Sequence, residues 1–184
     1  QIIYFFIKSL LIVSILALSG CATFDQSWKV DTSITKKNLD NVKIGDIIIT
    51  SKDWRNPMSW FGHSAVMVSK YKVGEYPELS YGYYETDIIL WLRKKKEFTV
   101  LRYKKFNDKF RSAFLKNLPD TKHKEYKIVD KTDNSAFYCS QYIWYLYWKT
   151  AKDLGYSLDV DKDGGYFVTP YDLLNSNYFD KVEF

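Results

Sequence analysis

Residues 135–154, SAFYCSQYIWYLYWKTAKDL, constrain the fold more than any other segment of the chain. Their aromatic and aliphatic side chains are too numerous to leave in water, and a glycine follows them directly. We therefore predict a helix from Cys139 to about Leu154, largely buried and ended by Gly155. A helix of this kind needs an apolar partner surface, which a β-sheet can supply.

The size and composition of the chain are consistent with one domain around an aromatic core. Its 184 residues suffice for one core, and 18% of them are aromatic, with 16 Tyr and 12 Phe. The net charge of +5 is compatible with an anionic bilayer or cell wall as a neighbour. The sequence has no dense basic stripe, zinc-finger spacing or Walker loop, so no nucleic-acid partner is expected.

Residues 1–20 are expected to be a secretory signal peptide and not part of the fold. Apart from Lys8 they are uncharged and mostly apolar, they end in small residues, and the run is too short for a stable membrane span. The tetrapeptide Leu18-Ser19-Gly20-Cys21 resembles a bacterial lipobox, in which cleavage leaves the cysteine N-terminal and lipid-modified. A plain signal with an incidental cysteine, or an uncleaved anchor, are the alternatives.

The lipoprotein interpretation divides the rest of the chain in two. Residues 21–41 become the lipidated Cys21 and a polar tether, and residues 42–184 form the catalytic domain. We expect a bacterial cell-envelope protein, held by lipid at the outer membrane, in the periplasm or at the cell surface. Cys139 then has no partner in the chain, and an unpaired thiol in an oxidising compartment is a candidate reactive group.

β-branched and alternating segments predict four strands. These strands are expected at residues 42–50, 63–71, 79–92 and 98–104. Residues 51–62 are expected to be a loop rich in turn-forming residues, and residues 93–97 a charged turn.

A second helix is predicted over residues 107–120, where apolar side chains recur every fourth position. Asn107 or Asp108 would cap it, and Pro119 would stop it. A helical turn is expected at residues 169–176, with Thr169 as its cap.

Residues 126–131 are expected to form a short strand. Together with the helices, the strands predict an α+β fold in which the sheet packs against the helix that carries Cys139.

The chain offers the parts of a thiol-based catalytic site. Cys139 would begin its helix, where the dipole lowers the pKa of a thiol, and its own N–H is a candidate oxyanion donor. His63, at the start of an apolar strand, is the preferred base, whereas His123 lies in a polar loop and is expected to face solvent.

A third group is needed to orient the histidine ring. Glu85 and Asp87 lie two residues apart, hence on one strand face, and either can reach His63 if their strands pair. Glu85 is preferred. Taken singly, Cys139, His63 and Glu85 each have an ordinary structural interpretation, and only their joint occurrence favours chemistry.

The segments GDIII, FGHSAVMV, YYETD and FYCSQYIW, in this order, resemble the permuted papain-like amidases related to NlpC-type cell-wall peptidases. In that group the histidine strand precedes the cysteine helix. The resemblance spans about residues 42–176 and implies an antiparallel sheet or barrel packed against the helix. It also implies Cys139 as nucleophile, His63 as base and Glu85 as third member.

The remaining parts of such a site are open. Tyr138, Gln141 and Tyr166 are candidates for a second oxyanion donor or a substrate contact. The expected mechanism is attack of the Cys139 thiolate on an amide or ester carbonyl, with His63 protonating the leaving group.

Residues 159–165, DVDKDGG, match the first half of an EF-hand loop. Asp159, Asp161 and Asp163 are candidate ligands for a structural calcium ion. Position twelve of such a loop is Pro170 instead of glutamate, so a plain acidic turn is the alternative.

Three functions stay open at this point. The first is a cysteine hydrolase, without a required cofactor, that cleaves amide bonds of envelope peptides such as peptidoglycan. The second is a lipid-directed thiol acyltransferase or esterase, and the third a non-catalytic envelope-binding lipoprotein. A monomer is expected, although the sequence carries no firm signal about oligomers.

Overall fold

The fold was analysed in a computed structural model that describes residues 28, 39–52, 60–77, 82–95 and 97–183. The expected signal peptide, Cys21, most of the tether and most of the loop 51–62 lie outside these residues. Within the described part, no helix is both long enough and apolar enough to cross a bilayer.

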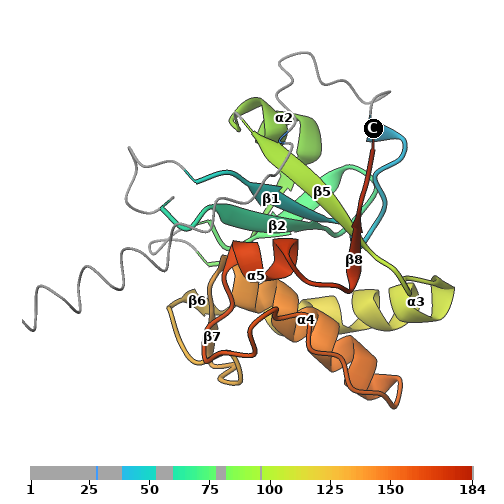
Figure 1. Cartoon of the computed structure of the whole chain (residues 1–184), viewed down its shortest axis with the longest axis vertical. Coiled ribbons are helices and arrows are strands. Elements are labelled where there is room, and N and C mark those ends of the chain that lie inside the picture. The colour runs from blue at the N-terminus through green and yellow to red at the C-terminus, as the bar shows by residue number, and fades with distance from the viewer. Residues whose placement is uncertain (1–27, 29–38, 53–59, 78–81, 96, 184) are drawn as a thin grey trace, which may run out of the picture.

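A six-stranded sheet with the order β4-β3-β2-β1-β5-β8 forms the centre of the fold, and every neighbouring pair in it is antiparallel (Figure 1). Its strands are β1 Ile47–Thr50, β2 His63–Met67, β3 Lys72–Glu75, β4 Tyr84–Asp87, β5 Phe98–Tyr103 and β8 Phe179–Lys181. The edge strands β4 and β8 do not pair with each other, so the sheet is open and not a closed barrel.

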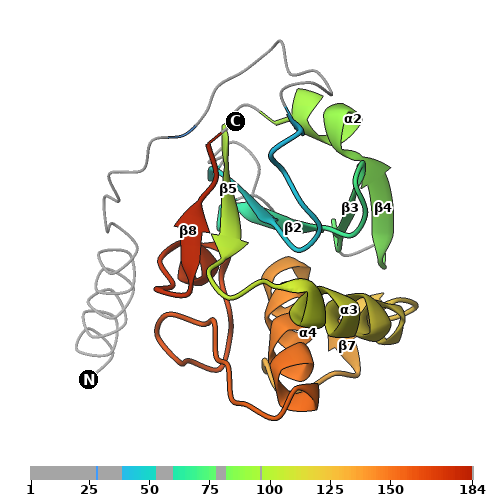
Figure 2. The same cartoon turned by 90° about the vertical axis from the view of Figure 1, so that its right-hand side faces the viewer.

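Helices cover both faces of this sheet (Figures 1 and 2). They are α2 Ile88–Arg93, α3 Asp108–Asn117, α4 Cys139–Asp153 and α5 Pro170–Leu174, with a 3-10 turn at Leu118–Thr121. A separate parallel pair is formed by β6 Glu125–Tyr126 and β7 Ala136–Phe137. The fold is thus α+β, as predicted.

Alternating side chains of the central strand β1 feed two hydrophobic cores. Ile47 and Ile49 face α3 and α4, whereas Ile48 faces the other side of the sheet, where α2 contributes Trp91 and Leu92. Because both faces are covered, the central strands are buried throughout and show little alternation of apolar and polar residues.

Helix α4 is the main element of the larger core. Its residues from Cys139 to Tyr147 are all buried, and Gly155 follows its end with a φ of +86°. The ring of Tyr147 contacts Phe110 and Phe114 of α3, and its hydroxyl donates a hydrogen bond to the Gly45 carbonyl. The predicted buried helix and aromatic core are confirmed.

The prediction for residues 79–92 was wrong in its second half. Of its described residues, 82–92, only Tyr84–Asp87 form a strand, and α2 begins at Ile88 because the Asp87 carboxylate accepts hydrogen bonds from the N–H groups of Ile89 and Leu90. The sequence also gave no signal for β3, β7 or β8. Strand β3 matters most, because it separates β4 from β2.

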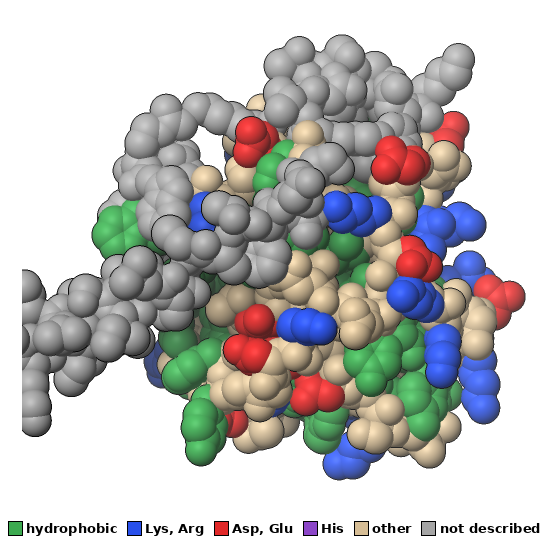
Figure 3. Space-filling view, in the orientation of Figure 1, with side chains coloured by type: hydrophobic (Ala, Val, Ile, Leu, Met, Phe, Trp, Pro, Cys, Tyr) green, Lys and Arg blue, Asp and Glu red, His purple; other side chains and the backbone are tan. Residues whose placement is uncertain are grey.

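Acidic and basic side chains are interspersed over the face seen in Figure 3. No single-sign field extends over that face.

Candidate functional site

Cys139 is the first residue of α4. Tyr138 before it is extended, and no side chain of the described residues caps this helix end. The first-turn N–H groups therefore remain available to an anion, and the positive end of the helix dipole lies at the thiol. Cys139 forms no disulfide within the described residues.

The adjacent Ser140 hydroxyl points elsewhere. It donates a hydrogen bond of 2.6 Å to the Val168 carbonyl, which fixes the segment before α5 against the start of α4. Its oxygen lies 3.9 Å from the Cys139 sulfur.

His63 opens β2, opposite Thr50 at the end of β1. The turn before it depends on Gly62, whose φ is +75° and whose position leaves no room for a side chain, because a Cβ there would lie 2.7 Å from the Thr50 carbonyl oxygen. The histidine is consequently held at a rigid strand end.

Glu75, at the end of β3, orients the histidine ring. The Nε2–H of His63 donates to Glu75 Oε2 at 2.7 Å, and both side chains are largely buried. The register explains the contact: Val66 pairs with Gly74, so the antiparallel β3 carries Glu75 back towards the start of β2. With Nε2 occupied, Nδ1 is the ring nitrogen left for the thiol.

The electrostatics favour a thiolate–imidazolium pair. Burial works against the imidazolium, but the hydrogen bonds to Cys139 and Glu75 raise the pKa of His63 to about 9. Burial likewise opposes the thiolate, yet the hydrogen bond and the charge of His63 outweigh it and lower the pKa of Cys139.

The Glu75 carboxyl stays ionised in the same network. Burial favours its neutral form, but the hydrogen bond and charge of His63 keep the pKa of Glu75 below its usual value. Charges of Glu75, His63 and Cys139 therefore alternate in sign along a chain of contacts.

The structure does not bring Glu85 to His63, and the prediction of Glu85 as orienting residue was wrong. Glu85 pairs in register with Gly74 of the intervening strand β3. Its carboxylate instead accepts hydrogen bonds from Lys122 at 2.6 Å and from the Tyr83 hydroxyl at 2.9 Å. The alternative, Asp87, caps α2.

Two further side chains surround the histidine. The Trp91 ring of α2 lies 6.2 Å from the His63 ring, centroid to centroid. The Lys95 ammonium lies 4.8 Å from the centroid of the Trp91 ring, and its charge acts on both Glu75 and Cys139.

The three residues predicted as oxyanion donors or substrate contacts lie in different environments. Gln141 is fully buried, and its amide group donates to the carbonyls of residues 130, 131 and 133, so it holds a loop and is not free to bind an oxyanion. The Tyr138 hydroxyl accepts a hydrogen bond from the Val168 N–H. Tyr166 is 78% exposed. His123 is exposed, as predicted, with a φ of 61°.

The acidic loop is arranged differently from the predicted calcium site. Asp161, Asp163 and Asp172 have carboxylate oxygens within 4.8 Å of one another, whereas Asp159 accepts a hydrogen bond from the Trp144 indole. A cation is already supplied by the protein, because Lys131 donates to Asp161 at 2.7 Å and to Asp159 at 3.2 Å.

Sequence reasoning missed Glu75 and Lys95. A glutamate twelve residues after the histidine is the spacing of a hairpin partner, which was a usable signal for Glu75. Lys95 lies in a run of lysines that is typical of a solvent-exposed turn. Its place beside Trp91, and so near His63, follows only from the packing of α2.

Comparison with known proteins gives a likeness of fold alone. No family model matches the chain, and no curated protein matches it. A solved structure, described as the crystal structure of metalloprotein YiiX from Escherichia coli O157:H7, DUF1105, superposes with a TM-score of 0.59 at 16% sequence identity. The match covers 77% of this chain and 97% of that one.

Proposed function

We propose that this protein is a thiol hydrolase that cleaves amide bonds in the cell envelope. The observation that carries the proposal is the hydrogen bond of 2.7 Å between Glu75 and His63. The same histidine ring interacts with the thiol of Cys139, which lies at the start of α4. A nucleophile, a base and a group that orients the base are the parts that acyl transfer requires.

In the proposed reaction, the Cys139 thiolate adds to the substrate carbonyl and an S–C bond forms. The oxyanion is bound by the Cys139 N–H and a neighbouring first-turn N–H. The His63 imidazolium then gives its proton to the leaving amine as the C–N bond breaks. Water, deprotonated by neutral His63, cleaves the thioester and regenerates the pair, while Glu75 holds the ring in place.

We further propose that the fold is the permuted papain-like one and that Cys21 carries the lipid anchor of a monomeric envelope protein. The order of elements supports the first point, because the histidine strand β2 precedes the cysteine helix α4. The lipobox-like Leu18-Ser19-Gly20-Cys21 supports the second.

The direct test compares the wild-type protein with the Cys139→Ala variant on purified peptidoglycan fragments, with release of free amines as the measurement. We expect turnover and labelling by a thiol-directed acyl probe to disappear in the variant. Full activity of Cys139→Ala would overturn the proposal. His123→Asn serves as the control, because that histidine is exposed and lies outside the network.

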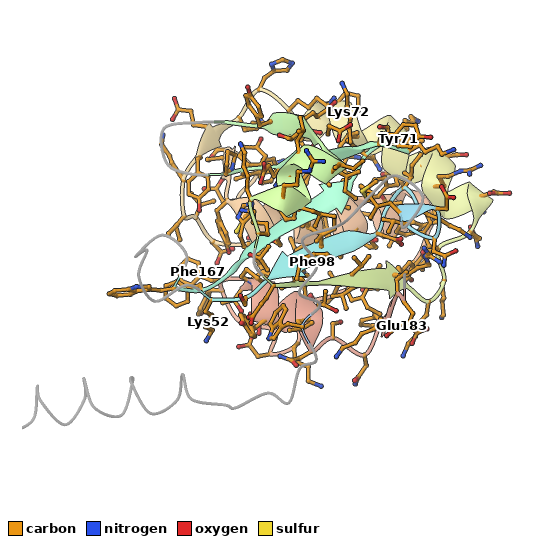
Figure 4. All side chains as sticks on the ribbon, turned by 90° about the horizontal axis from the view of Figure 1, so that it is seen from above. Lys52, Tyr71, Lys72, Phe98, Phe167 and Glu183 are labelled. Carbon is orange, nitrogen blue, oxygen red and sulfur yellow. The ribbon has the colours of Figure 1, made fainter. Side chains whose placement is uncertain are left out.

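A second candidate, a thiol esterase or acyltransferase acting on lipids, is favoured by exposed aromatic side chains near the site. Phe61, two residues before His63, is 65% exposed, and Phe167, just before the segment that Ser140 holds, is 53% exposed. Figure 4 shows Phe167 and Lys52 at the same edge of the molecule. A substrate panel divided between muropeptides and acyl lipids distinguishes the two candidates.

A further inference from the structure

Lys95 occupies an unusual place for a surface lysine. It follows α2, and its backbone N–H donates to the Leu92 carbonyl at 2.9 Å. Its side chain is partly buried and its ammonium lies over Trp91, the residue whose ring packs beside His63. A cation is thus held at the edge of the proposed catalytic network.

The donors of this ammonium have no acceptor among the residues that the structure describes. Within the described residues, Lys95 forms no ion pair and its side chain makes no hydrogen bond, unlike Lys122 and Lys131, which are both paired with carboxylates. A lysine ammonium has three N–H donors. Those of Lys95 are left to solvent or to a ligand.

Its surroundings make an anionic ligand favourable. Burial lowers the pKa of Lys95, while the charges of Glu75 and Cys139 act in the opposite direction. Partial loss of water strengthens the attraction between the ammonium and any carboxylate that arrives, because the effective dielectric constant is below that of water.

A purely structural role explains less of the geometry. The charge of Lys95 acts on Glu75, but the carboxylate takes its direct ion pair from His63, and no ion pair within 4.0 Å joins it to Lys95. The cation–π contact with Trp91 positions the ammonium without consuming its donors.

We propose that Lys95 forms a carboxylate-binding subsite beside Cys139, so that the preferred substrate carries a carboxylate close to the carbonyl that the thiolate attacks. This inference rests on the proposed thiol chemistry. A carboxylate suits the single ammonium, because one charge meets one charge and its two oxygens accept from the free donors. Amide-linked peptides with free α- or side-chain carboxylates belong to this substrate class.

Two alkylating reagents of nearly equal size test the subsite without a known substrate. Iodoacetate carries a carboxylate and iodoacetamide does not, and each reacts by forming an S–C bond as iodide leaves. The rates are measured at Cys139 by peptide mass spectrometry of the full chain in detergent, so that any reaction at Cys21 is counted separately. The quantity compared is the ratio of the iodoacetate rate to the iodoacetamide rate.

We expect Lys95→Met to lower this ratio by about tenfold, as removal of one nearby charge should. Lys95→Arg should keep the ratio close to wild type, and Lys94→Met, which removes an exposed lysine one residue away, should leave it unchanged. An unchanged ratio in Lys95→Met, or an equal fall in Lys94→Met, would overturn the subsite.

Failure of the subsite and failure of the proposed function give different results. If wild-type Cys139 reacts with neither reagent faster than a free peptide thiol near pH 7, the thiolate itself is absent and both proposals fall. If Cys139 reacts fast with both reagents but the ratio of their rates is the same in wild type and Lys95→Met, the thiol chemistry stands and only the subsite is rejected.

A titration separates a charge effect from a change of packing. The charged groups that face His63 are Cys139, Glu75 and Lys95, and the positive charge of Lys95 lowers the histidine pKa. Lys95→Met should therefore raise the pKa of His63, followed by NMR titration, relative to that of the wild-type protein. A downward movement or none would contradict the assigned position of the ammonium.

Discussion

At the scale of single residues, the choice between Glu75 and Glu85 decides which carboxylate orients the histidine. We predict that Glu75→Gln lowers kcat/KM by about 10² to 10⁴-fold, because the neutral amide no longer favours the imidazolium. The measurement is the pH profile of turnover. Its upper limb should move to lower pH, since the hydrogen bond from His63 to Glu75 is one of the contacts that raise the His63 pKa.

Glu85→Gln is the matched control, because it removes a carboxylate of equal size that is paired with Lys122 and Tyr83 instead. It should leave both kcat/KM and the pH profile as in wild type. A large loss of activity in Glu85→Gln with little loss in Glu75→Gln would restore the residue that the sequence favoured.

The two histidines also allow the coupling of Cys139 and His63 to be measured directly. Cys139 is among the groups that raise the His63 pKa to about 9, so Cys139→Ala should lower the His63 pKa in an NMR titration. Only two histidine signals are present, and His123→Asn removes the other one. An unshifted His63 in Cys139→Ala would show that the thiol and the ring do not interact.

The same coupling predicts a bell-shaped pH dependence of kcat/KM. Activity should rise as Cys139 ionises, at a pH below the ordinary thiol pKa because His63 lowers it. It should fall as His63 loses its proton near pH 9, because the leaving amine then lacks its acid. A profile still rising above pH 10 would contradict the assignment of His63.

At the scale of elements, the loop 159–165 and α5 share the acidic cluster. Asp172 belongs to the capping box of α5, where its carboxylate accepts from the Thr169 N–H at 2.7 Å, and Lys131 already neutralises Asp161. We therefore expect millimolar calcium to leave the melting temperature of the wild-type protein unchanged. A calcium-dependent rise that Asp163→Asn abolishes would show a metal site there.

Elements with local signals were predictable, and those defined by long-range pairing were not. Helix α3 shows its spacing and its Asn107 cap in the sequence, and α5 shows Thr169 followed by proline. Strand β3 has only the residues KVGE, with two charges and a glycine, so it became visible only through its partners β2 and β4.

The candidate site followed the same division. The expectations for Cys139 and His63 used the start of one helix and the start of one strand, which are local features. The identity of the third group depended on which strand lies beside β2. Because β3 was not predicted, Glu85 of the next strand was preferred, whereas the structure places Glu75 at the histidine. The apolar run IILWLR is compatible with either a strand or a helix. It forms the helix α2 because Asp87 caps the N-terminal end.

At the scale of the whole molecule, one set of polar contacts joins the entry of the chain into the domain to β5, the strand between β1 and the edge strand β8. The buried Asp46 carboxylate accepts two hydrogen bonds from the Arg102 guanidinium of β5, at 2.9 and 2.7 Å, and a third from the Lys43 N–H. Arg102 also donates to the Asn41 carbonyl. The segment nearest the proposed lipid tether is thereby fastened to β5.

We predict that Asp46→Asn lowers the free energy of unfolding by about 2 kcal/mol, because the pair loses its negative charge and an amide NH2 replaces one of the two acceptor oxygens. Asp108→Asn is the matched control: it too removes an aspartate paired with an arginine, Arg111 at 3.2 Å, but on an exposed helix surface, so no measurable change is expected. Urea unfolding gives both values.

Because Asp46 touches none of Cys139, His63 and Glu75, the iodoacetamide rate of Cys139 in the folded Asp46→Asn variant should equal that of wild type. Equal free energies of unfolding for the two variants would mean that the Asp46–Arg102 contacts do not stabilise the fold. A lower iodoacetamide rate at Cys139 in Asp46→Asn would mean that residues 41–46 and the catalytic network are coupled.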